Sequence, residues 1–280
     1  MISGPEFYSN HWLHFIDIGL KGKPLMESTV RVEIRNRVCT LTLNRPEVMN
    51  AFSEQMLGDF QDALDRISRD EAVNVVILQG AGGNFSSGAE LSPRNYSLGH
   101  DELHEIMKRL GKWVQTLREL RQPVIGKVRG MAVGGGANLA LSCDFVLAAH
   151  EARFIQPFIH IGLITDLGGT YFLPRLVGLA KARELAMLGD KLSARDAASI
   201  GLIYKSLPDE KLDGAVSDLA ETLAQKSPSA MALIKKGLNK SHDMLLEEVL
   251  AWEAARQTER IRSAEHQEAV IKFMQSRSKK

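Results

Sequence analysis

The sequence predicts a mixed α/β fold whose strands run at least partly parallel, followed by a helical region at the C-terminal end. Between residues 29 and 207, apolar strand-like runs alternate with loops and with segments of helical periodicity. Two of the loops are rich in glycine and directly follow a strand-like run. In α/β domains of this kind, ligands bind beyond the carboxyl ends of the strands. The two glycine-rich loops therefore predict one shared ligand site.

Composition excludes several classes of protein. With 280 residues, 44% of them hydrophobic and 25% charged, the chain can build a substantial core and is neither disordered nor fibrous. Its 35 basic and 34 acidic residues leave a formal charge of +1, so we expect no binding to nucleic acid or to an anionic membrane surface. The apolar stretches are too short or too interrupted to span a bilayer, and the N-terminus lacks the pattern of a secretory leader.

The two cysteines, Cys39 and Cys143, lie far apart in the sequence, and each has apolar strand-like neighbours. This arrangement fits buried free thiols better than a disulfide framework or a metal site, so we expect a reducing compartment, the cytoplasm. Residues 1–26 are unusual, with aromatic and histidine side chains crowded before a short basic stretch. We interpret them as a native N-terminal extension or as residues introduced by cloning.

The first elements of the core are predicted to be a hairpin and a helix. Apolar residues alternate with charged ones over 30–34 and resume over 38–43, which predicts two strands joined by a tight turn at residues 35–37. Ser53 precedes a segment whose apolar residues recur at helical spacing up to Ile67. A serine in this place predicts the N-cap of a helix.

A strand, a loop and a helix follow, and the same order then begins again. The apolar run 73–78 predicts a buried strand, and the glycine-rich loop at 80–91 can form neither a helix nor a strand. Residues 101–120 show helical periodicity, and the apolar run 123–128 predicts the next strand.

The second glycine-rich stretch, at residues 130–141, is the feature around which we organise the chain. Gly134, Gly135 and Gly136 end a strand and open a helix. Without Cβ atoms the backbone can approach a ligand closely, and the free N–H groups of a first helical turn favour negative charge. The stretch therefore predicts a place to bind an oxyanion, with a tight turn that serves only packing as the alternative.

The remaining elements are predicted less sharply. Residues 144–148 predict a strand, glycines interrupt the apolar segment 154–175, Ser193 caps a short helix, and residues 202–207 form a further candidate strand. After Pro208 the chain is predicted to be helical, in about three helices separated at Pro228 and Gly237. The apolar faces of these helices need a cover, for which we expect a partner subunit.

Several short motifs stand in a fixed order along the chain. They are Leu43-Asn44-Arg45-Pro46, Phe85-Ser86-Ser87-Gly88-Ala89-Glu90-Leu91, Gly134-Gly135-Gly136-Ala137-Asn138-Leu139-Ala140, Cys143-Asp144, Gly168-Gly169-Thr170, Leu188-Gly189-Asp190-Lys191-Leu192-Ser193-Ala194 and Ala197-Ala198-Ser199-Ile200-Gly201-Leu202. Each motif alone is weak. In this order they resemble the signature of the crotonase (enoyl-CoA hydratase/isomerase) superfamily, over essentially residues 30–273.

The resemblance implies a crotonase (ClpP-like) spiral of ββα units over residues 27–207 and a C-terminal helical region, residues 208–280, used in trimerisation. It implies an acyl-CoA thioester as substrate and a homotrimer or hexamer (a dimer of trimers) as assembly, with a related hydratase subunit as a further candidate partner. Coenzyme A is then part of the substrate, and we expect no metal and no redox cofactor.

By the same resemblance, the backbone N–H groups of Ala89 and Gly135 are the two donors of an oxyanion hole. This role makes chemical sense, because removing a proton next to a thioester moves negative charge onto the carbonyl oxygen. Two preorganised donors stabilise such an enolate, and losing one donor typically costs about 3 to 4 kcal/mol of transition-state stabilisation.

The sequence departs from the hydratase pattern at two positions. Hydratases of this family use two glutamates to orient and activate the water that is added to the double bond. The matching residues here are Asn138 and Phe158, which cannot accept or donate a proton in that role. We therefore expect that hydration with two carboxylates does not operate in this chain.

One carboxylate lies at a position that bears on the reaction mechanism. Asp166 matches the aspartate that acts as acid and base in some isomerases of the family, among them dienoyl-CoA isomerases and the ring-epoxyphenylacetyl-CoA isomerase of phenylacetate breakdown. The residues over 161–178 and 136–141 are most similar to the latter group. Apolar neighbours such as Phe158 and Leu167 could raise the pKa of Asp166 into a range useful for moving protons. The structural alternative for Asp166 is a helix N-cap.

Other polar residues are weaker candidates. His160 is interpreted as a core histidine and Asp144 as structural, while Glu90 is a second, weaker acid/base candidate. Ser87 has no partner base in the sequence, so it is not expected to be a nucleophile, but its backbone, by resemblance, lies near the adenine of CoA. The predicted substrate- and CoA-binding residues are Ser87, Ala89, Gly135, Asn138, Phe158, Arg45, Arg94, Lys272 and Phe273, the last two acting within the chain or across a subunit boundary.

The sequence thus predicts an enoyl-CoA isomerase of fatty-acid metabolism or phenylacetate catabolism, with Asp166 as acid/base. Two alternatives stay open. The first is a hydratase with non-standard acid/base groups, using Glu90 or a water bound by Asn138. The second is a catalytically silent acyl-CoA-binding subunit that supports a related hydratase.

Overall fold

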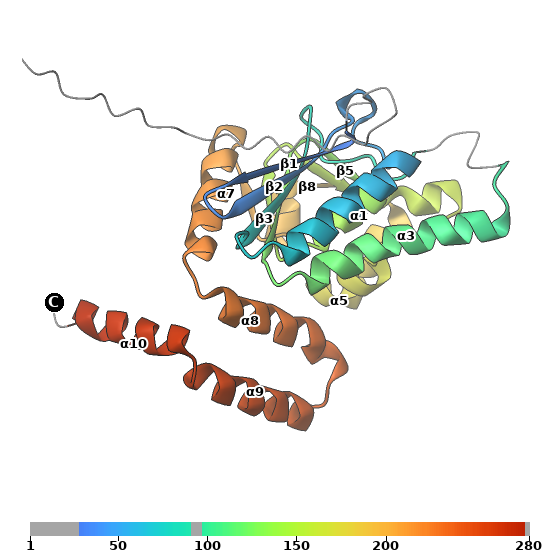
Figure 1. Ribbon diagram of the computed structural model, residues 1–280. Helices are drawn as coiled ribbons and strands as arrows, with labels where there is room; N and C mark the ends of the chain where they lie inside the picture. Colours follow the sequence, from blue (N-terminus) through green and yellow to red (C-terminus); the bar gives the residue numbers. More distant parts are fainter. Residues whose placement is uncertain (1–27, 91–96, 278–280) are drawn as a thin grey trace, which may run out of the picture.

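The computed structural model describes residues 28–90 and 97–277, and its core is a six-stranded sheet with the order β1-β2-β3-β4-β6-β9 (Figure 1). The first two strands pair antiparallel and every later pair is parallel. The carboxyl ends of the parallel strands therefore lie at one edge. The strands are β1 (Val30–Arg35), β2 (Val38–Leu43), β3 (Val75–Gly80), β4 (Val124–Val128), β6 (Phe145–Ala149) and β9 (Lys205–Leu207).

A second, smaller sheet was not predicted from the sequence. Its strands are β5 (Met131–Val133), β7 (Arg153–Ile155) and β8 (Lys191–Ser193), in the order β5-β7-β8. Strands of three residues are too short to show a period of two, so the sequence carries no pattern for them. This sheet follows directly on from the main one, because β5 begins three residues after β4 ends.

The predicted hairpin is confirmed, and two strand boundaries are corrected. Asn36 and Arg37 both adopt positive φ angles, 49° and 67°, and so make the tight turn between β1 and β2. β3 begins at Val75, two residues later than predicted. The candidate strand at 202–207 shrinks to β9, because residues 202–204 form a turn.

Helices cover both faces of the main sheet. α1 (Glu54–Arg69), which Ser53 caps through a hydrogen bond from the Met56 N–H, packs against α3 (His100–Glu119) on one face (Figure 1). Trp113 of α3 is completely buried there against the rings of Phe52 and Phe60. α7 (Asp209–Ala224) covers the other face, where it buries apolar side chains of β3, β4 and β6.

Shorter elements surround the second sheet. α4 (Gly135–Leu141) follows β5, and α5 (Gly169–Leu188) bends at Gly178, whose φ of 73° is not helical. α6 (Ala194–Ser199) begins at the predicted cap, Ser193. Three 3-10 turns complete the described residues: η1 (Pro46–Val48), η2 (Pro157–Ile161) and η3 (Ser241–Asp243).

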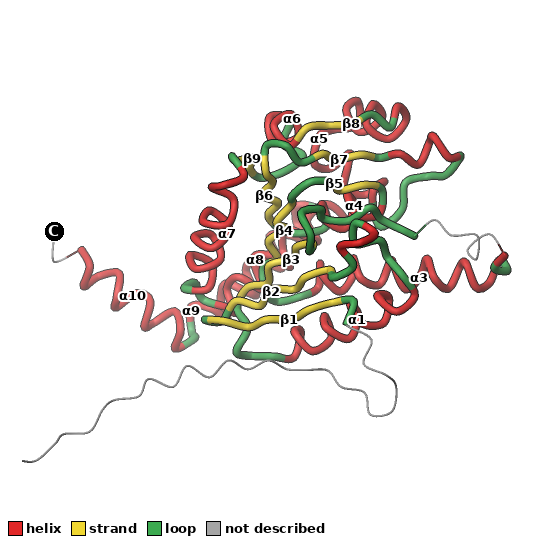
Figure 2. Tube along the Cα trace, turned by 90° about the horizontal axis from the view of Figure 1, so that it is seen from above, coloured by secondary structure: helices red, strands yellow, loops and turns green. Residues whose placement is uncertain are grey.

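The prediction of about three helices after Pro208 is wrong, because the described residues of this region form four. After α7 come α8 (Pro228–Lys240), α9 (Leu246–Ile261) and α10 (Ala264–Arg277), which extend from the core as an arm (Figures 1 and 2). Gly237 does not end a helix. It lies within α8, where a side-chain carbon would come within 2.7 Å of the ring of Trp252 in α9, so the glycine permits close packing of two helices.

A buried ion pair ties the arm to the core. Lys235 of α8 is 7% exposed, and its Nζ donates to Oδ2 of Asp144 at 2.7 Å. The same Nζ donates to the backbone carbonyls of Leu117, within α3, and of Gln122, after α3. The same carboxylate oxygen accepts a hydrogen bond from the Val124 N–H, so the expected structural role of Asp144 is confirmed. No helix of the described residues is both long and apolar enough to cross a membrane. The interpretation of residues 1–26 concerns a segment outside the described residues.

Candidate active site

The two glycine-rich loops meet at the carboxyl ends of β3 and β4, as the sequence predicts. Ser86 pairs with Ala132 of β5, and the Val133 N–H donates to the Ser86 carbonyl at 2.9 Å. Gly88, at φ 82°, allows this contact, since a side-chain carbon there would lie 2.7 Å from the Val133 carbonyl oxygen and 3.1 Å from the Gly135 nitrogen. The backbone next to Ala89 therefore lies against the start of α4.

Both predicted oxyanion donors lack a backbone acceptor in the described part of the chain. Gly135 is the first residue of α4, so its N–H has no partner within the helix, and the preceding Gly134 has no side chain that could cap it. Phe52 and Ala89 form a parallel β-bridge whose hydrogen bonds involve the residues on either side of Ala89. The Phe52 N–H donates to the Gly88 carbonyl, and the Phe52 carbonyl accepts from the Glu90 N–H. Among the described residues, neither the Ala89 nor the Gly135 N–H donates to another backbone group.

Asp166 lies beside Gly135, one of these two donors. A side-chain carbon built on Gly135 would come within 3.4 Å of Oδ1 of Asp166 and 3.5 Å of the Leu167 side chain. The N-cap alternative is wrong, because α5 begins at Gly169 after Gly168 and the Gly169 N–H donates to the backbone carbonyl of Asp166 at 2.8 Å, not to its carboxylate. The carboxylate is therefore not used as a helix cap.

The environment of Asp166 favours its protonated form. Oδ1 is buried and has no hydrogen-bond partner among the described residues. Burial raises the pKa of Asp166 from 3.8 to about 6, although a hydrogen bond from its own backbone N–H acts in the opposite direction. A carboxyl with this pKa can both take up and release a proton near neutral pH.

The two positions that hold glutamates in hydratases are occupied by buried side chains with other roles. Asn138 is 0% exposed, and its Nδ2 donates to Oγ1 of Thr165 at 3.0 Å and to the Asp166 carbonyl at 2.8 Å. The Phe158 ring, 8% exposed, packs beside Gly134. Neither position supplies a carboxylate near Gly135.

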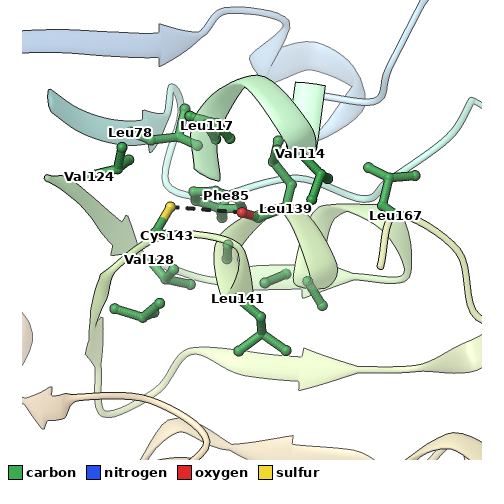
Figure 3. Packing of buried hydrophobic residues seen from close by; sticks show 14 of the residues in the cluster. Leu78, Phe85, Val114, Leu117, Val124, Val128, Leu139, Leu141, Cys143 and Leu167 are labelled. Carbon is green, nitrogen blue, oxygen red and sulfur yellow. Dashed lines mark hydrogen bonds between the residues drawn. The ribbon is translucent and has the colours of Figure 1, made fainter. Parts of the chain in front are cut away.

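α4 is fixed by the core behind it. Leu139 and Cys143 extend among Leu78 and Val124, and the Cys143 thiol donates to the Leu139 carbonyl (Figure 3). Cys143 and Cys39 are buried free thiols, as predicted. Burial raises both thiol pKa values, that of Cys39 to about 12, so these groups are poor nucleophiles.

Arg45 and Glu90 bind each other. The Nη1 atom of Arg45 donates to Oε2 of Glu90 at 2.9 Å and to the Ala51 carbonyl at 2.8 Å, so this guanidinium links the first glycine-rich loop to the turn after β2. Ser87 is half-buried, and its hydroxyl donates to the Val48 carbonyl at 3.3 Å. These contacts give Arg45 and Ser87 a role in shaping the loop beside any contact with CoA.

Two of the remaining predicted CoA contacts, Lys272 and Phe273, lie away from this site within one chain. Arg94 lies outside the described residues. Lys272 and Phe273 lie on α10, which both ribbon views place at the end of the arm, away from α4 and β5 (Figures 1 and 2). The interpretation of His160 as a core histidine is wrong, because the residue is exposed on η2, with its Nε2 3.4 Å from the Gly189 carbonyl oxygen.

Two residues of the site were missed by sequence reasoning. Gln156 and Thr165 both hydrogen-bond to Asn138. Gln156 directly follows β7 and precedes Pro157, and Thr165 directly precedes Asp166. The only signal in the sequence was this adjacency of Thr165 to the acid/base candidate, since no motif marks an uncharged buried network.

Known proteins with similar sequences and structures support the assignment of a family. A family model described as enoyl-CoA hydratase/isomerase matches residues 33–280. The chain is 38% identical to a 1,2-epoxyphenylacetyl-CoA isomerase of Escherichia coli, over 88% of this chain and 95% of that protein. It is 37% identical to a probable enoyl-CoA hydratase of Rhodobacter capsulatus, over 89% and 96%. A crystal structure of an enoyl-CoA hydratase from Bacillus anthracis superposes with a TM-score of 0.85 at 30% identity, over 89% of this chain and 96% of that chain.

The raised pKa of Asp166 predicts that Asp166→Asn stabilises the protein at high pH but not at low pH. The folded-state pKa of about 6 exceeds the usual 3.8, so the free energy of unfolding falls as the pH rises through this interval and the carboxyl ionises. Above the interval this loss of stability is complete. The uncharged amide avoids the loss, which we put at about 1–2 kcal/mol for this partly exposed group. Urea unfolding of both proteins from pH 4 to pH 8 measures the difference. A difference that does not change with pH would mean that Asp166 has an ordinary pKa.

Proposed function

The chain belongs to the enoyl-CoA hydratase/isomerase family, and we propose that it is an isomerase that moves a proton, and with it a double bond, along an acyl-CoA thioester. Asp166 is the acid/base, and the N–H groups of Ala89 and Gly135 stabilise the enolate. One observation carries this proposal: a buried carboxylate oxygen with no hydrogen-bond partner among the described residues lies against the glycine that supplies one of the two donors.

The reaction needs only these groups. Asp166 takes a proton from a carbon activated by the thioester, and the electrons of the broken C–H bond pass into the enolate, whose oxygen accepts hydrogen bonds from Ala89 and Gly135. The same carboxyl, now protonated, returns the proton to another carbon as the double bond shifts. Atoms and electrons balance without water or a redox partner. A pKa of about 6 suits a group that acts first as base and then as acid.

The hydratase alternative has less support from the geometry. The Glu90 carboxylate forms an ion pair with Arg45, so it is not the free base that this alternative requires. Both Nδ2 and Oδ1 of Asn138 are occupied by protein partners and the residue is fully buried, which leaves it poorly placed to bind a catalytic water. Because some relatives are named as hydratases, the tests below include this alternative.

Names of other relatives bear on the choice of substrates. One is a 1,2-epoxyphenylacetyl-CoA isomerase and another, from Streptococcus mutans, is a trans-2-decenoyl-[acyl-carrier-protein] isomerase at 32% identity over 72% of this chain. We propose an acyl-CoA thioester as substrate, with straight-chain 3-enoyl groups and a phenylacetate-derived ring as the two classes to be compared. Neither chemistry calls for a metal or a redox cofactor.

We also propose a cytoplasmic homotrimer, or a hexamer built from two trimers. The arm formed by α8, α9 and α10 exposes large apolar side chains along its length, including Leu238, Leu246, Leu250 and Met274, each more than half exposed. Large apolar side chains left exposed along one arm favour an interface with another subunit. Light scattering coupled to size exclusion should give a mass of three or six times the 31.0 kDa chain. A monomer at micromolar concentration would contradict the proposed assembly.

The central prediction is that Asp166→Asn loses isomerisation while it still binds acyl-CoA. The assay incubates the protein with 3-hexenoyl-CoA in deuterated water and follows both the shift of the double bond and deuterium uptake by mass spectrometry. Without its acid/base the variant should lose roughly 10²–10⁴-fold in rate. Calorimetry with butyryl-CoA should give unchanged affinity. Asp62→Asn, on the exposed face of α1 in the same protein, is the matched control and should retain full activity.

Several outcomes would overturn the proposal. Near-normal turnover by Asp166→Asn would remove Asp166 from the mechanism. Hydration of crotonyl-CoA by the unaltered protein, at rates ordinary for hydratases of the family, would contradict the interpretation of Asn138 and Phe158. Inactivity of the unaltered protein on every enoyl-CoA, together with measurable binding of butyryl-CoA, would identify a silent acyl-CoA-binding subunit instead.

A further inference from the structure

Behind Asp166 lies a closed ring of hydrogen bonds among three uncharged side chains. Nε2 of Gln156 donates to Oδ1 of Asn138 at 2.7 Å, Nδ2 of Asn138 donates to Oγ1 of Thr165 at 3.0 Å, and that hydroxyl donates to Oε1 of Gln156 at 3.3 Å. Gln156 is 5% exposed and Asn138 is fully buried. One bond leaves the ring, from Nδ2 of Asn138 to the Asp166 carbonyl at 2.8 Å.

We propose that Asn138, Gln156 and Thr165 are positioning residues that fix the carboxylate of Asp166 against Gly135. The proposal rests on the proposed function, in which Asp166 is the acid/base. None of the three needs to touch the substrate. Their effect on catalysis passes through the backbone of Asp166, which the ring orients through its outgoing bond.

The direction of the bonds explains why an amide occupies position 138. Each member of the ring both donates and accepts, and Asn138 gives its two N–H protons to Thr165 and to Asp166. A carboxylate at this position would have no proton for either bond, and it would add negative charge beside Asp166. Asn138 is therefore required as a donor, and restoring a hydratase-like acidic residue there would break the ring.

The backbone around Asp166 leaves little freedom once the ring is formed. The Asp166 carbonyl accepts from the Gly169 N–H as well as from Asn138. A side-chain carbon at Gly169 would collide with Oγ1 of Thr165 and come within 2.6 Å of Nδ2 of Asn138, so only glycine fits against the ring. Leu167 adopts a φ of 42°, a conformation that is costly for leucine and persists only where the surroundings impose it.

Removing the Thr165 hydroxyl isolates the contribution of the ring. Thr165→Val keeps the shape of the side chain but leaves one N–H of Asn138 and Oε1 of Gln156 without partners. The bond from Asn138 to Asp166 is then no longer held in one orientation, and the carboxylate should shift. A displacement of about 1 Å in a catalytic group can cost roughly 10²-fold in rate.

The test compares kcat and KM for 3-hexenoyl-CoA in Thr165→Val, in Thr165→Ser and in the unaltered protein, with activity normalised to the folded fraction from circular dichroism. We expect Thr165→Val to lower kcat about 10- to 100-fold at nearly constant KM, and Thr165→Ser, which keeps the hydroxyl, to restore it. A residue that served stability alone would lower the unfolding temperature but leave kcat per folded molecule unchanged. Thr165→Ala provides the same comparison if the valine variant does not fold.

A second arm tests the direction of the bonds. Asn138→Asp has nearly the same shape but lacks the donor, so it should lose kcat as Thr165→Val does and should gain no hydration of crotonyl-CoA. Normal kcat in Thr165→Val and Asn138→Asp, together with an inactive Asp166→Asn, would overturn the positioning role and leave the proposed function intact. An active Asp166→Asn would instead overturn the proposed function itself.

Discussion

The candidate site depends on a single constraint: one buried carboxylate oxygen, Oδ1 of Asp166, has no hydrogen-bond partner among the described residues. Burying Oδ1 of Asp166 without a hydrogen bond costs stability, and the same burial raises the pKa of the carboxyl. The fold tolerates it because neighbouring groups are satisfied: Asn138, Thr165 and Gly169 all bond within the loop or to it. What is unfavourable for folding suits the proposed chemistry, in which the carboxylate next to Gly135 exchanges protons with an acyl chain.

The parallel sheet brings the two glycine-rich loops together. β3 and β4 end at the same edge, so the segments that leave them meet, and glycine at position 88 lets their backbones touch. That contact brings together the N–H groups of Ala89 and Gly135, which have no backbone partner among the described residues. The donors come from the backbone and do not depend on side-chain identity. In the proposed function the reaction type is therefore set by the residues around them, above all by Asp166 and by Asn138 and Phe158, which the resemblance matches to the two glutamates of hydratases.

Sequence patterns predicted the parts of this structure that rest on local chemistry. The hairpin, the serine caps at Ser53 and Ser193 and the two glycine-rich loops each have a local cause, and all were found. The second sheet could not be predicted, because strands of three residues have no visible period. Gly237 was misinterpreted as a helix break because its role depends on Trp252, a residue of the next helix. The ring around Asn138 escaped notice for a similar reason: Asn138, Gln156 and Thr165 come from three separate segments, and only the folded chain brings their polar atoms together.

A crystal structure of the protein with a bound, unreactive acyl-CoA analogue tests the central claim most directly. The account predicts that the thioester oxygen lies about 2.7–3.1 Å from the backbone nitrogens of both Ala89 and Gly135. It also predicts that the Asp166 carboxylate lies about 3–3.5 Å from a carbon of the acyl chain that can lose a proton. A thioester oxygen bound away from these two nitrogens, or an acyl chain separated from Asp166 by a water or by another side chain, would contradict it.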